Sequence, residues 1–572
     1  MTAHLLALSI GPVQEFIAAA RRTRDLWFGS YLLSEISKAA AKAVQESGAK
    51  LIFPAPLNPS QLNRDSDLNV ANVIVAELHA VEPRPVAKTA EHAAEKRWRS
   101  FADEVYDKFP TVIRKNIWDE QVEDVIEFYA AWQVFSPETY ERDRAALMRL
   151  LAARKSCRDF QPAKGYPGIP KSSLDGARES VLDRSQKWPP DIVRRVRVNE
   201  GEQLDSVGMV KRAWTPTGGP VAYPSVARVA ADPWLRSVDP SRLSPLIEAC
   251  DKLGRDIVHR IDTSRNPHYT SFPFDGTVVY PSRYRELQEE TNATESDLQV
   301  LLDALTPLTR KYGDPSPYLC MLSADGDGMG KAISTLESSD RHRTFSRALS
   351  AFADQAHHIV NTHKGVLVYA GGDDVLAFLP VDQCVRCARA LRDQFTSTLA
   401  AWSQEKTPLS LSVGLAIGHF MEPLEDLLRY GREAEKHAKR PRPENKGQAE
   451  KDGLAVHVIK RGGEPVAMRA NWITDPDQHL TKLATWLASG GVPHGLAYDF
   501  HNIADLYDRW PADSVERAIR SDTLSILKGK TGAHKAEEIA DLVRSQVSDA
   551  DSLRRLADEL LVSRQTVTVA AP

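Results

Sequence analysis

Two acidic motifs in the second half of the chain carry residue types suited to metal-dependent phosphoryl chemistry. Asp325-Gly326-Asp327 follows directly on an apolar run that starts at Tyr318, and Gly371-Gly372-Asp373-Asp374 lies between two further apolar runs. Carboxylates are hard oxygen ligands, and Mg²⁺ commonly binds one or two of them together with substrate phosphates. The glycines lack a Cβ, so a triphosphate could approach the backbone closely.

The spacing of apolar residues predicts the elements that bring these motifs together. The runs at 318–324, 365–370 and 375–379 are typical of buried strands, and Gly-Gly between the last two predicts a tight hairpin. Apolar residues recur at helical spacing between Phe345 and Val360, which predicts an amphipathic helix. If the first strand pairs beside the hairpin, all four aspartates meet at one sheet edge.

Four carboxylates at one edge would repel one another unless cations lay among them. We therefore interpret Asp325, Asp373 and Asp374, with Asp327 in support, as ligands of two Mg²⁺ or Mn²⁺ ions in a nucleotidyl-transfer site. In such a site one ion activates a hydroxyl and the other holds the leaving pyrophosphate.

Two other interpretations of these motifs compete with a metal site. The first is an ordinary surface turn rich in Asp and Gly. The second is an EF-hand loop starting at Asp325, in which Gly330 fits the sixth position. The EF-hand fails because Met329 and Leu336 stand where that loop needs an Asp or Asn and a bidentate Glu.

Length and charge limit the class of protein. At 572 residues the chain has room for three to four domains of roughly 150 residues each, and 42% hydrophobic residues are ordinary for a globular protein. The net charge of −4 gives no global attraction to nucleic acid, so any such surface must be local. Basic clusters at 21–24, 194–197 and 436–442 are candidates, although each could be only a solvated face.

Cysteine usage and apolar runs favour a cytoplasmic protein. Five scattered cysteines, an odd number, argue against a disulfide framework. Cys384 and Cys387 form a C-x-x-C in a helical pattern without a second pair, so we expect no zinc there. The N-terminal apolar run, Leu5 to Ile10, is too short for a signal peptide, and no run reaches the roughly 20 apolar residues of a membrane span.

The order of predicted elements indicates an α+β multidomain fold. Strand, helix, strand, strand, helix and strand follow one another over 1–136, the order of a ferredoxin-like palm, here without metal ligands. Residues 137–310 are mainly helical, 311–470 repeat the palm order with the acidic motifs, and 471–572 are helical again. The chain therefore predicts two palms and two mainly helical domains.

The chain resembles the large palm-domain subunit of type III CRISPR effector complexes, in particular the type III-B (Cmr) branch. The resemblance rests on motifs in order along nearly the whole chain: residues 11–17, 20–27, 29–33, 153–155, 170–180, 201–204, 325–331, 371–374, 412–414, 435–439 and 461–464. Each motif alone is weak, but together they are specific.

The resemblance implies two palms packed as in nucleotide cyclases, with ATP between them. It implies a target-RNA-activated nucleotidyltransferase that converts ATP to cyclic oligoadenylates, working with the other Cmr subunits, CRISPR RNA and target RNA. By motif match, Asp325 and Asp374 are the best metal ligands, with Asp373 and Asp327 supporting. Gly371, Gly372 and Gly326 would line the nucleotide, and Lys439 would neutralise phosphates unless it is an ordinary exposed lysine at a helix end.

Two departures from the family pattern carry expectations of their own. No upstream His-Asp pair precedes the first palm, so we expect no HD nuclease domain and no DNase activity. Lys171-Ser172-Ser173-Leu174 occupies the region where relatives can hold a cysteine zinc site, so zinc is not expected. The rival functions are a catalytically silent ATP-binding scaffold and a diguanylate-cyclase-like enzyme. The ring size, and an alternative acceptor such as S-adenosylmethionine, are left open.

Overall fold

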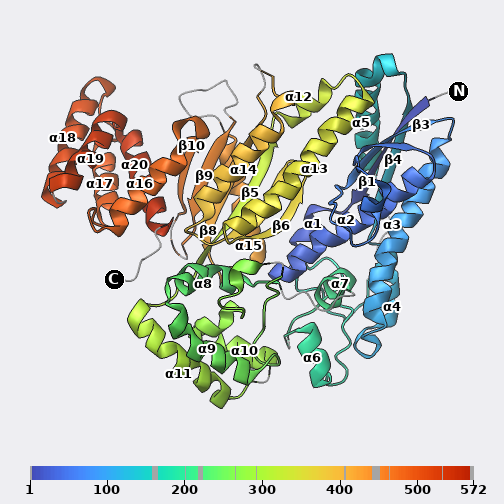
Figure 1. The fold of residues 1–572 in the computed structure, drawn as a ribbon, viewed down its shortest axis with the longest axis horizontal. Helices are drawn as coiled ribbons and strands as arrows, with labels where there is room; N and C mark the ends of the chain where they lie inside the picture. The colour runs from blue at the N-terminus through green and yellow to red at the C-terminus, as the bar shows by residue number, and fades with distance from the viewer. Residues whose placement is uncertain are drawn as a thin grey trace.

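The computed structural model describes residues 3–157, 165–199, 201–216, 223–264, 266–291, 293–404, 408–440, 451–460, 462, 464–530 and 533–566. Figure 1 shows two sheets side by side, each covered by helices, with a helical lobe below them (green) and a second one at the C-terminal end (red). Within the described part of the chain, no helix has the length and apolar character needed to cross a membrane. The α+β multidomain fold predicted from the sequence is confirmed.

The first sheet has the ferredoxin-like strand order. Its strands are β1 (Ala3–Gly11), β2 (Lys50–Phe53), β3 (Val73–His79) and β4 (Glu127–Val134), and they lie in the order β2-β3-β1-β4 with every neighbouring pair antiparallel. Residues alternate between the two faces of a strand, so β1 contributes Leu6 and Leu8 to one core and Leu5 and Ala7 to another. Both faces of this sheet are therefore buried.

Helices cover both faces of the first sheet. The first face packs against α2 (Thr23–Glu46) and α3 (Pro83–Tyr106), which are preceded and followed by the short helices α1 (Gln14–Ala18) and α4 (Lys115–Glu123). The second face is covered by α5 (Tyr140–Ser156), whose Leu147 and Leu151 share a core with Leu5 and Ala7. The predicted first domain ends at residue 136, just before this helix, although α5 packs against the first palm. Helical periodicity does not show which sheet a helix covers, so no sequence pattern indicated this contact.

The second sheet repeats this order and extends it. Its strands are β5 (Tyr318–Asp327), β6 (Val366–Gly371), β7 (Asp374–Leu379), β8 (Ser410–His419), β9 (Gly453–Val458) and β10 (Val466–Asn471). They lie in the order β6-β7-β5-β8-β9-β10, so the first four match the order of the first palm. The apolar runs at 318–324, 365–370 and 375–379 predicted β5, β6 and β7, and the palm order predicted one further strand after them. At the far edge β10 pairs antiparallel with β9.

The second sheet also separates two layers of helices. One face of β5 carries Cys320, Leu322 and Ala324 into a core with α13 (Ser339–Thr362) and α14 (Cys384–Thr398). The other face carries Met321 toward α15 (Leu424–Ala438), the crossover helix between the parallel strands β8 and β9. Because β5 alternates, Ser323, Asp325 and Asp327 share the α15 face with Met321. The one-turn helix α12 (Met329–Ser334) follows β5 directly.

Helices make up the two remaining regions. The middle lobe holds α6 (Pro190–Val196), α7 (Ser206–Ala213), α8 (Val226–Ser237), α9 (Pro240–Leu253), α10 (Tyr284–Thr291) and α11 (Glu295–Tyr312). The C-terminal lobe holds α16 (Pro476–Ala488), α17 (Leu496–Tyr507), α18 (Ala512–Lys530), α19 (Ala533–Gln546) and α20 (Ala550–Thr566). Both regions are helical, as the apolar periodicity predicted.

A buried polar seam joins the two palms. Arg343 of α13 donates from Nε to the carbonyl oxygen of Leu51 at 2.8 Å and from Nη2 to Glu77 Oε1 at 2.5 Å. One residue earlier, the His342 ring contacts the Tyr140 hydroxyl at 2.9 Å between Nδ1 and Oη. Arg343, Glu77 and His342 are all buried. The helix that leads to the hairpin is therefore fixed against the first sheet.

Two arginines of the first predicted basic cluster make contacts inside the chain. Arg22 forms an ion pair with Glu290 at 2.6 Å, and Arg24 donates to the carbonyl oxygens of Arg212 and Trp214. These guanidinium groups tie α2 to the middle lobe and are not free for nucleic acid. In the third cluster, Pro441 and Arg442 lie outside the described residues, as do Arg461 and Gly463 of the last sequence motif.

Candidate active site

The strand register brings the two acidic motifs together where β5 ends beside the start of its neighbour β7. Ala324 of β5 is opposite Val375 of β7, so the next residues, Asp325 and Asp374, are neighbours across the two strands. The hairpin turn between β6 and β7 consists of Gly372 and Asp373. Gly372 has a φ of +70°, a left-handed conformation that favours glycine. The prediction that the first strand pairs beside the hairpin is confirmed.

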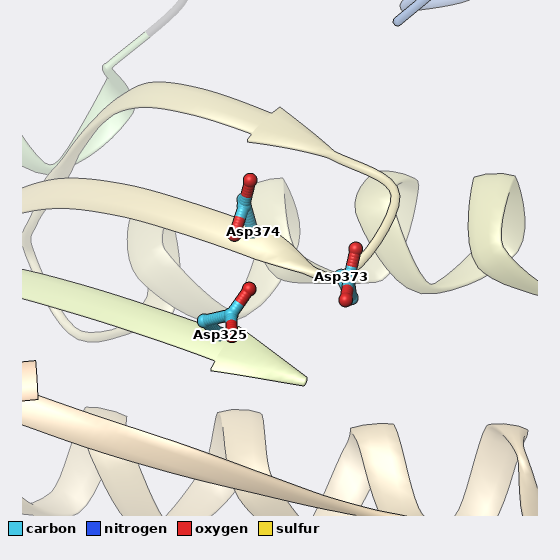
Figure 2. A group of neighbouring side chains, drawn as sticks. All are labelled: Asp325, Asp373 and Asp374. Carbon is cyan, nitrogen blue, oxygen red and sulfur yellow. The ribbon is translucent and has the colours of Figure 1, made fainter. Parts of the chain in front are cut away.

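Three of the four predicted carboxylates form one group (Figure 2). Asp325 lies on β5, Asp374 at the start of β7 and Asp373 in the turn, and one carboxylate oxygen from each lies within 4.8 Å of the others. Among the residues that the structure describes, no other group of three or more His, Cys, Asp or Glu side chains meets this spacing. The arrangement is the convergence of carboxylates that the sequence predicted.

Gly326 is needed for this convergence. A Cβ at Gly326 would lie 2.7 Å from the Asp373 Cβ and 2.9 Å from both Met329 and Phe395. Any side chain at this position would push the hairpin turn away from β5. The sequence motif predicted that Gly326 lines the nucleotide, whereas the structure shows it in close contact with the turn that carries Asp373.

The crowding of carboxylates has an electrostatic cost. Burial, the negative charge of Asp325 and other neighbours raise the pKa of Asp373 to about 6. Asp374 is more exposed than Asp373. Partial desolvation, a hydrogen bond with Asp325 and the charge of Asp373 nevertheless raise the pKa of Asp374 well above its usual range. Both shifts mean that Asp373 and Asp374 resist ionisation at this position, which a cation beside them would relieve.

One cation of the chain already contacts the group. Lys439, at the C-terminal end of α15, forms an ion pair with Asp325 Oδ2, and its Nζ also lies 3.1 Å from Glu435 Oε1. Burial alone would lower the pKa of Lys439, but Asp325 and Glu435 outweigh that effect and hold it above its usual value. Lys439 is therefore no ordinary exposed lysine, because it is the counter-ion of Asp325.

The structure separates Asp327 from the other three aspartates. Its Oδ2 accepts from the hydroxyls of Ser410 at 2.9 Å and Ser412 at 2.7 Å and from the backbone N–H of Asp452 at 3.0 Å. These bonds tie the end of β5 to β8 and to the start of β9. Burial raises the pKa of Asp327, and its buried Oδ1 has no hydrogen-bond partner. Asp327 lies outside the three-carboxylate group, so its metal role stays a prediction, and its hydrogen bonds give it a structural role.

The two glycines of the hairpin differ in their surroundings. A Cβ at Gly371 would lie 2.0 Å from the Tyr369 hydroxyl, whereas a Cβ at Gly372 would meet nothing within 4 Å. Gly372 also borders a small pocket between the palms, whose walls include Asn69 from the first palm and Asp354 from α13. Of the two, Gly372 is the one whose backbone a ligand can approach.

Comparison with known proteins supports the assignment that the motifs suggested. A family model described as "Cas10/Cmr2, second palm domain" matches residues 318–452, and one described as "CRISPR-associated protein Cmr2, N-terminal" matches residues 5–103. A relative from Pyrococcus furiosus, "CRISPR system Cmr subunit Cmr2", is 23% identical in an alignment 651 residues long, gaps included. This alignment covers 95% of this chain and 71% of that protein. Residues 5–103 and 318–452 of this chain thus match two domains of the Cas10/Cmr2 family.

Solved structures extend this likeness to the fold. The Cmr-beta complex of type III-B in its apo state contains a chain that matches with a TM-score of 0.64 at 13% identity, covering 93% of this chain and 78% of that chain. The Cmr-beta complex bound to cognate target RNA gives a TM-score of 0.66 at 14% identity, with coverage of 93% and 79%. This chain therefore shares its fold with these two chains over 93% of its length.

Sequence reasoning missed two residues of the site. Glu435 contacts Lys439, and its Oε2 accepts from the Ser323 hydroxyl at 2.7 Å. The available signal was spacing: Glu435 and Lys439 are four residues apart on a helix, and Ser323 is two residues before Asp325 on a strand. What spacing could not show is that the helix face and the strand face are opposed.

The donor set fits a divalent metal ion. The site offers hard oxygen ligands within reach of one centre from Asp325, Asp373 and Asp374. Their mutual repulsion is offset in part by Lys439, which pairs with Asp325. Mg²⁺ also keeps coordination positions for water and phosphate, and the open side of Gly372 leaves room for these. The residues present are those that a Mg²⁺ or Mn²⁺ site would use.

Proposed function

We propose that this chain is a metal-dependent nucleotidyltransferase that converts ATP to cyclic oligoadenylate or a related adenylylated messenger. The observation that carries the proposal is the group formed by Asp325, Asp373 and Asp374 at the end of a palm sheet, beside a glycine turn with an open backbone. Bound there, Mg²⁺ or Mn²⁺ would polarise the reacting phosphoryl group and stabilise the charge of the attacking and leaving oxygens.

Each residue of the site has a role that follows from its position. The three aspartates hold the cations, and Asp325 and Asp374 do so from adjacent strands whose register is fixed. The Gly372 backbone lies open for close approach of phosphate oxygens. Lys439 contributes a positive charge that phosphates can use once it leaves Asp325. Phosphoryl transfer depends mainly on positioning and charge neutralisation, and these residues provide both.

The alternative is a catalytically silent subunit that binds ATP. The carboxylate group favours an enzyme, because binding alone does not require three clustered acidic side chains, two of which have a pKa raised by burial and by the neighbouring carboxylates. The first palm has the same strand order, but among its described residues there is no such group. We therefore assign catalysis to the second palm.

We further propose that the chain works within a Cmr complex that holds CRISPR RNA and recognises target RNA. Support comes from the family and from the similar fold of a chain in Cmr-beta bound to cognate target RNA. We expect the purified chain alone to turn over little ATP, with synthesis rising when guide and target RNA are supplied in the complex. Strong synthesis by the isolated chain would contradict this dependence.

The decisive test is Asp373→Ala combined with Asp374→Ala in the assembled complex. Product formation should fall by roughly a thousandfold or more, because the loss of metal ligands removes several kcal/mol of transition-state stabilisation. Assembly and target RNA binding should stay near wild type, because the change removes repulsion and opens no core cavity. Glu425→Ala with Glu433→Ala, two exposed acidic residues on α15, is the matched control and should keep full synthesis.

Mass analysis of the products would also identify the messenger, including any adduct with an acceptor such as S-adenosylmethionine. Retained synthesis in the double aspartate variant would place catalysis elsewhere. Lost assembly would show that these carboxylates are structural.

A further inference from the structure

Two glycines allow helix α15 to lie in direct contact with the second sheet at the turn that carries Glu435 and Lys439. A Cβ at Gly414 of β8 would lie 2.0 Å from the Glu435 backbone nitrogen, and one at Gly453 of β9 would lie 2.1 Å from the Ala438 carbonyl oxygen. The obstructing atoms are backbone atoms, so they could move only with the whole helix. The positions of Glu435 and Lys439 above β5 are therefore set by the sheet itself.

This contact places the Lys439 ammonium between two carboxylates. Lys439 pairs with Asp325 on one side and with Glu435 Oε1, at 3.1 Å, on the other, and Glu435 lies four residues earlier on the same helix. Glu435 is itself held by the Ser323 hydroxyl, which is buried and donates to Oε2 at 2.7 Å. The exposed fractions are 26% for Lys439, 18% for Glu435 and 30% for Asp325, so water screens these charges only in part.

A metal ion and the Lys439 ammonium compete for the same carboxylate. Both are cations, and both need the Asp325 carboxylate, one as a ligand and the other as its ion-pair partner. When a divalent cation binds the aspartates, an ammonium left on Asp325 would be repelled by it. The side chain of lysine is long and flexible, and the second carboxylate in reach is that of Glu435.

We propose that Glu435 is a positioning residue for the metal site, because it retains the Lys439 ammonium after a divalent cation displaces that group from Asp325. This inference rests on the proposed function, which requires a metal at the three aspartates. In the metal-free chain Lys439 offsets the repulsion within the acidic group. In the metal-bound chain Glu435 holds Lys439 beside the site, where its charge is available to phosphates.

The proposal is tested by Mn²⁺ binding to the full-length, nucleotide-free chain, with free Mn²⁺ measured by electron paramagnetic resonance. Lys439→Met should bind Mn²⁺ about tenfold more tightly, because the competing cation is gone. Glu435→Gln should bind it about tenfold more weakly, because Lys439 then stays on Asp325. Lys436→Met removes an exposed lysine from the same helix turn and should match wild type within about twofold. Unchanged urea unfolding midpoints show that the variants are folded.

The double variant separates this exchange from simple attraction through space. If Glu435 acts through Lys439, adding Glu435→Gln to Lys439→Met should change the Mn²⁺ affinity by less than about twofold. If Glu435 only attracts the metal through space, the same tenfold loss will appear in both backgrounds, and the proposal is then wrong. Weaker binding by Lys439→Met alone would also overturn it.

A further double variant, at two of the aspartates, distinguishes failure of this inference from failure of the proposed function. Asp325→Asn with Asp374→Asn should abolish saturable Mn²⁺ binding. If binding survives this change, or if wild type shows none, the metal site of the proposed function is refuted together with the exchange. If binding is lost but the Glu435 and Lys439 effects are additive, only the exchange is refuted.

Discussion

Replacement of Arg343 by Met tests whether the polar seam between the palms stabilises their contact. The substitution keeps an unbranched apolar side chain of similar length and removes the guanidinium that binds Glu77 and the Leu51 carbonyl. Glu77 would then be a buried carboxylate without its main partner. Burial alone would raise the pKa of Glu77, but hydrogen bonds from Ser339 and Arg343 and the charges of Arg343 and Lys50 hold it below its usual value.

The expected cost follows from burial and from the partner that remains. Removing one member of a buried ion pair typically costs 3–5 kcal/mol, because the other charge stays in place without compensation. Lys50 Nζ lies 3.6 Å from the same Glu77 oxygen, but its side chain is 59% exposed, so it compensates only in part. We therefore expect the lower end of that range, about 3 kcal/mol at pH 7.

Hydrogen exchange measures this cost locally, which matters because a chain of several domains has no single unfolding free energy. Backbone amides of β2 and of the first turns of α13 should exchange about a hundredfold faster in Arg343→Met, since each 1.4 kcal/mol is a factor of ten. Arg347→Met is the control, because Arg347 is exposed and donates to the Ala55 carbonyl oxygen at 3.4 Å only. It should change exchange by less than a few fold.

Acid and a second substitution provide the refuting results. The depressed pKa of Glu77 stabilises the wild type above pH 4.5, and this contribution is lost as the pH falls through the folded pKa. The deficit of Arg343→Met should therefore shrink below pH 4.5. Adding Glu77→Leu should recover most of the loss, because no unpaired charge remains. A deficit no larger than that of Arg347→Met, or no recovery with Glu77→Leu, would refute the reasoning.

Two further predictions follow from the packing around the site. Burial lowers the pKa of His342 from 6.5 to about 3, with help from Arg144 and Arg343, so stability is complete above pH 6.5 and falls as the pH drops toward 3. In hydrogen exchange of the α13 amides, corrected for intrinsic rates, His342→Gln should remove about 2 kcal/mol of the stability lost between pH 7 and pH 5, and an unchanged pH dependence would contradict this. Gly414→Ala should destabilise the second palm by about 3 kcal/mol and weaken Mn²⁺ binding, because the new Cβ meets the α15 backbone. Gly330→Ala in α12, where a Cβ meets nothing within 4 Å, should be neutral or slightly stabilising, and equal effects of the two would refute the close-contact argument.

Local patterns determined the elements and the chemistry of the site. Apolar runs bounded by Gly and Asp marked β5, β6 and β7, and helical periodicity marked α13, because period and turn residues act within a few positions. Residue types also indicated the chemistry, since carboxylates next to glycines suit cation and phosphate binding, although the same residue types occur in surface turns. The succession of predicted strands and helices then indicated two ferredoxin-like palms, and both sheets show that strand order.

Tertiary structure decided which of these residues act together. Asp325 and Asp327 have the same residue type and lie two positions apart on one strand face, yet one joins the carboxylate group while the other is bound by Ser410, Ser412 and the Asp452 backbone. The difference comes from the strands that flank β5 at each position. Likewise Glu435 enters the site only because Gly414 and Gly453 allow α15 to touch the sheet. Such contacts join residues far apart in the chain, so no local pattern encodes them, and only the packed fold reveals them.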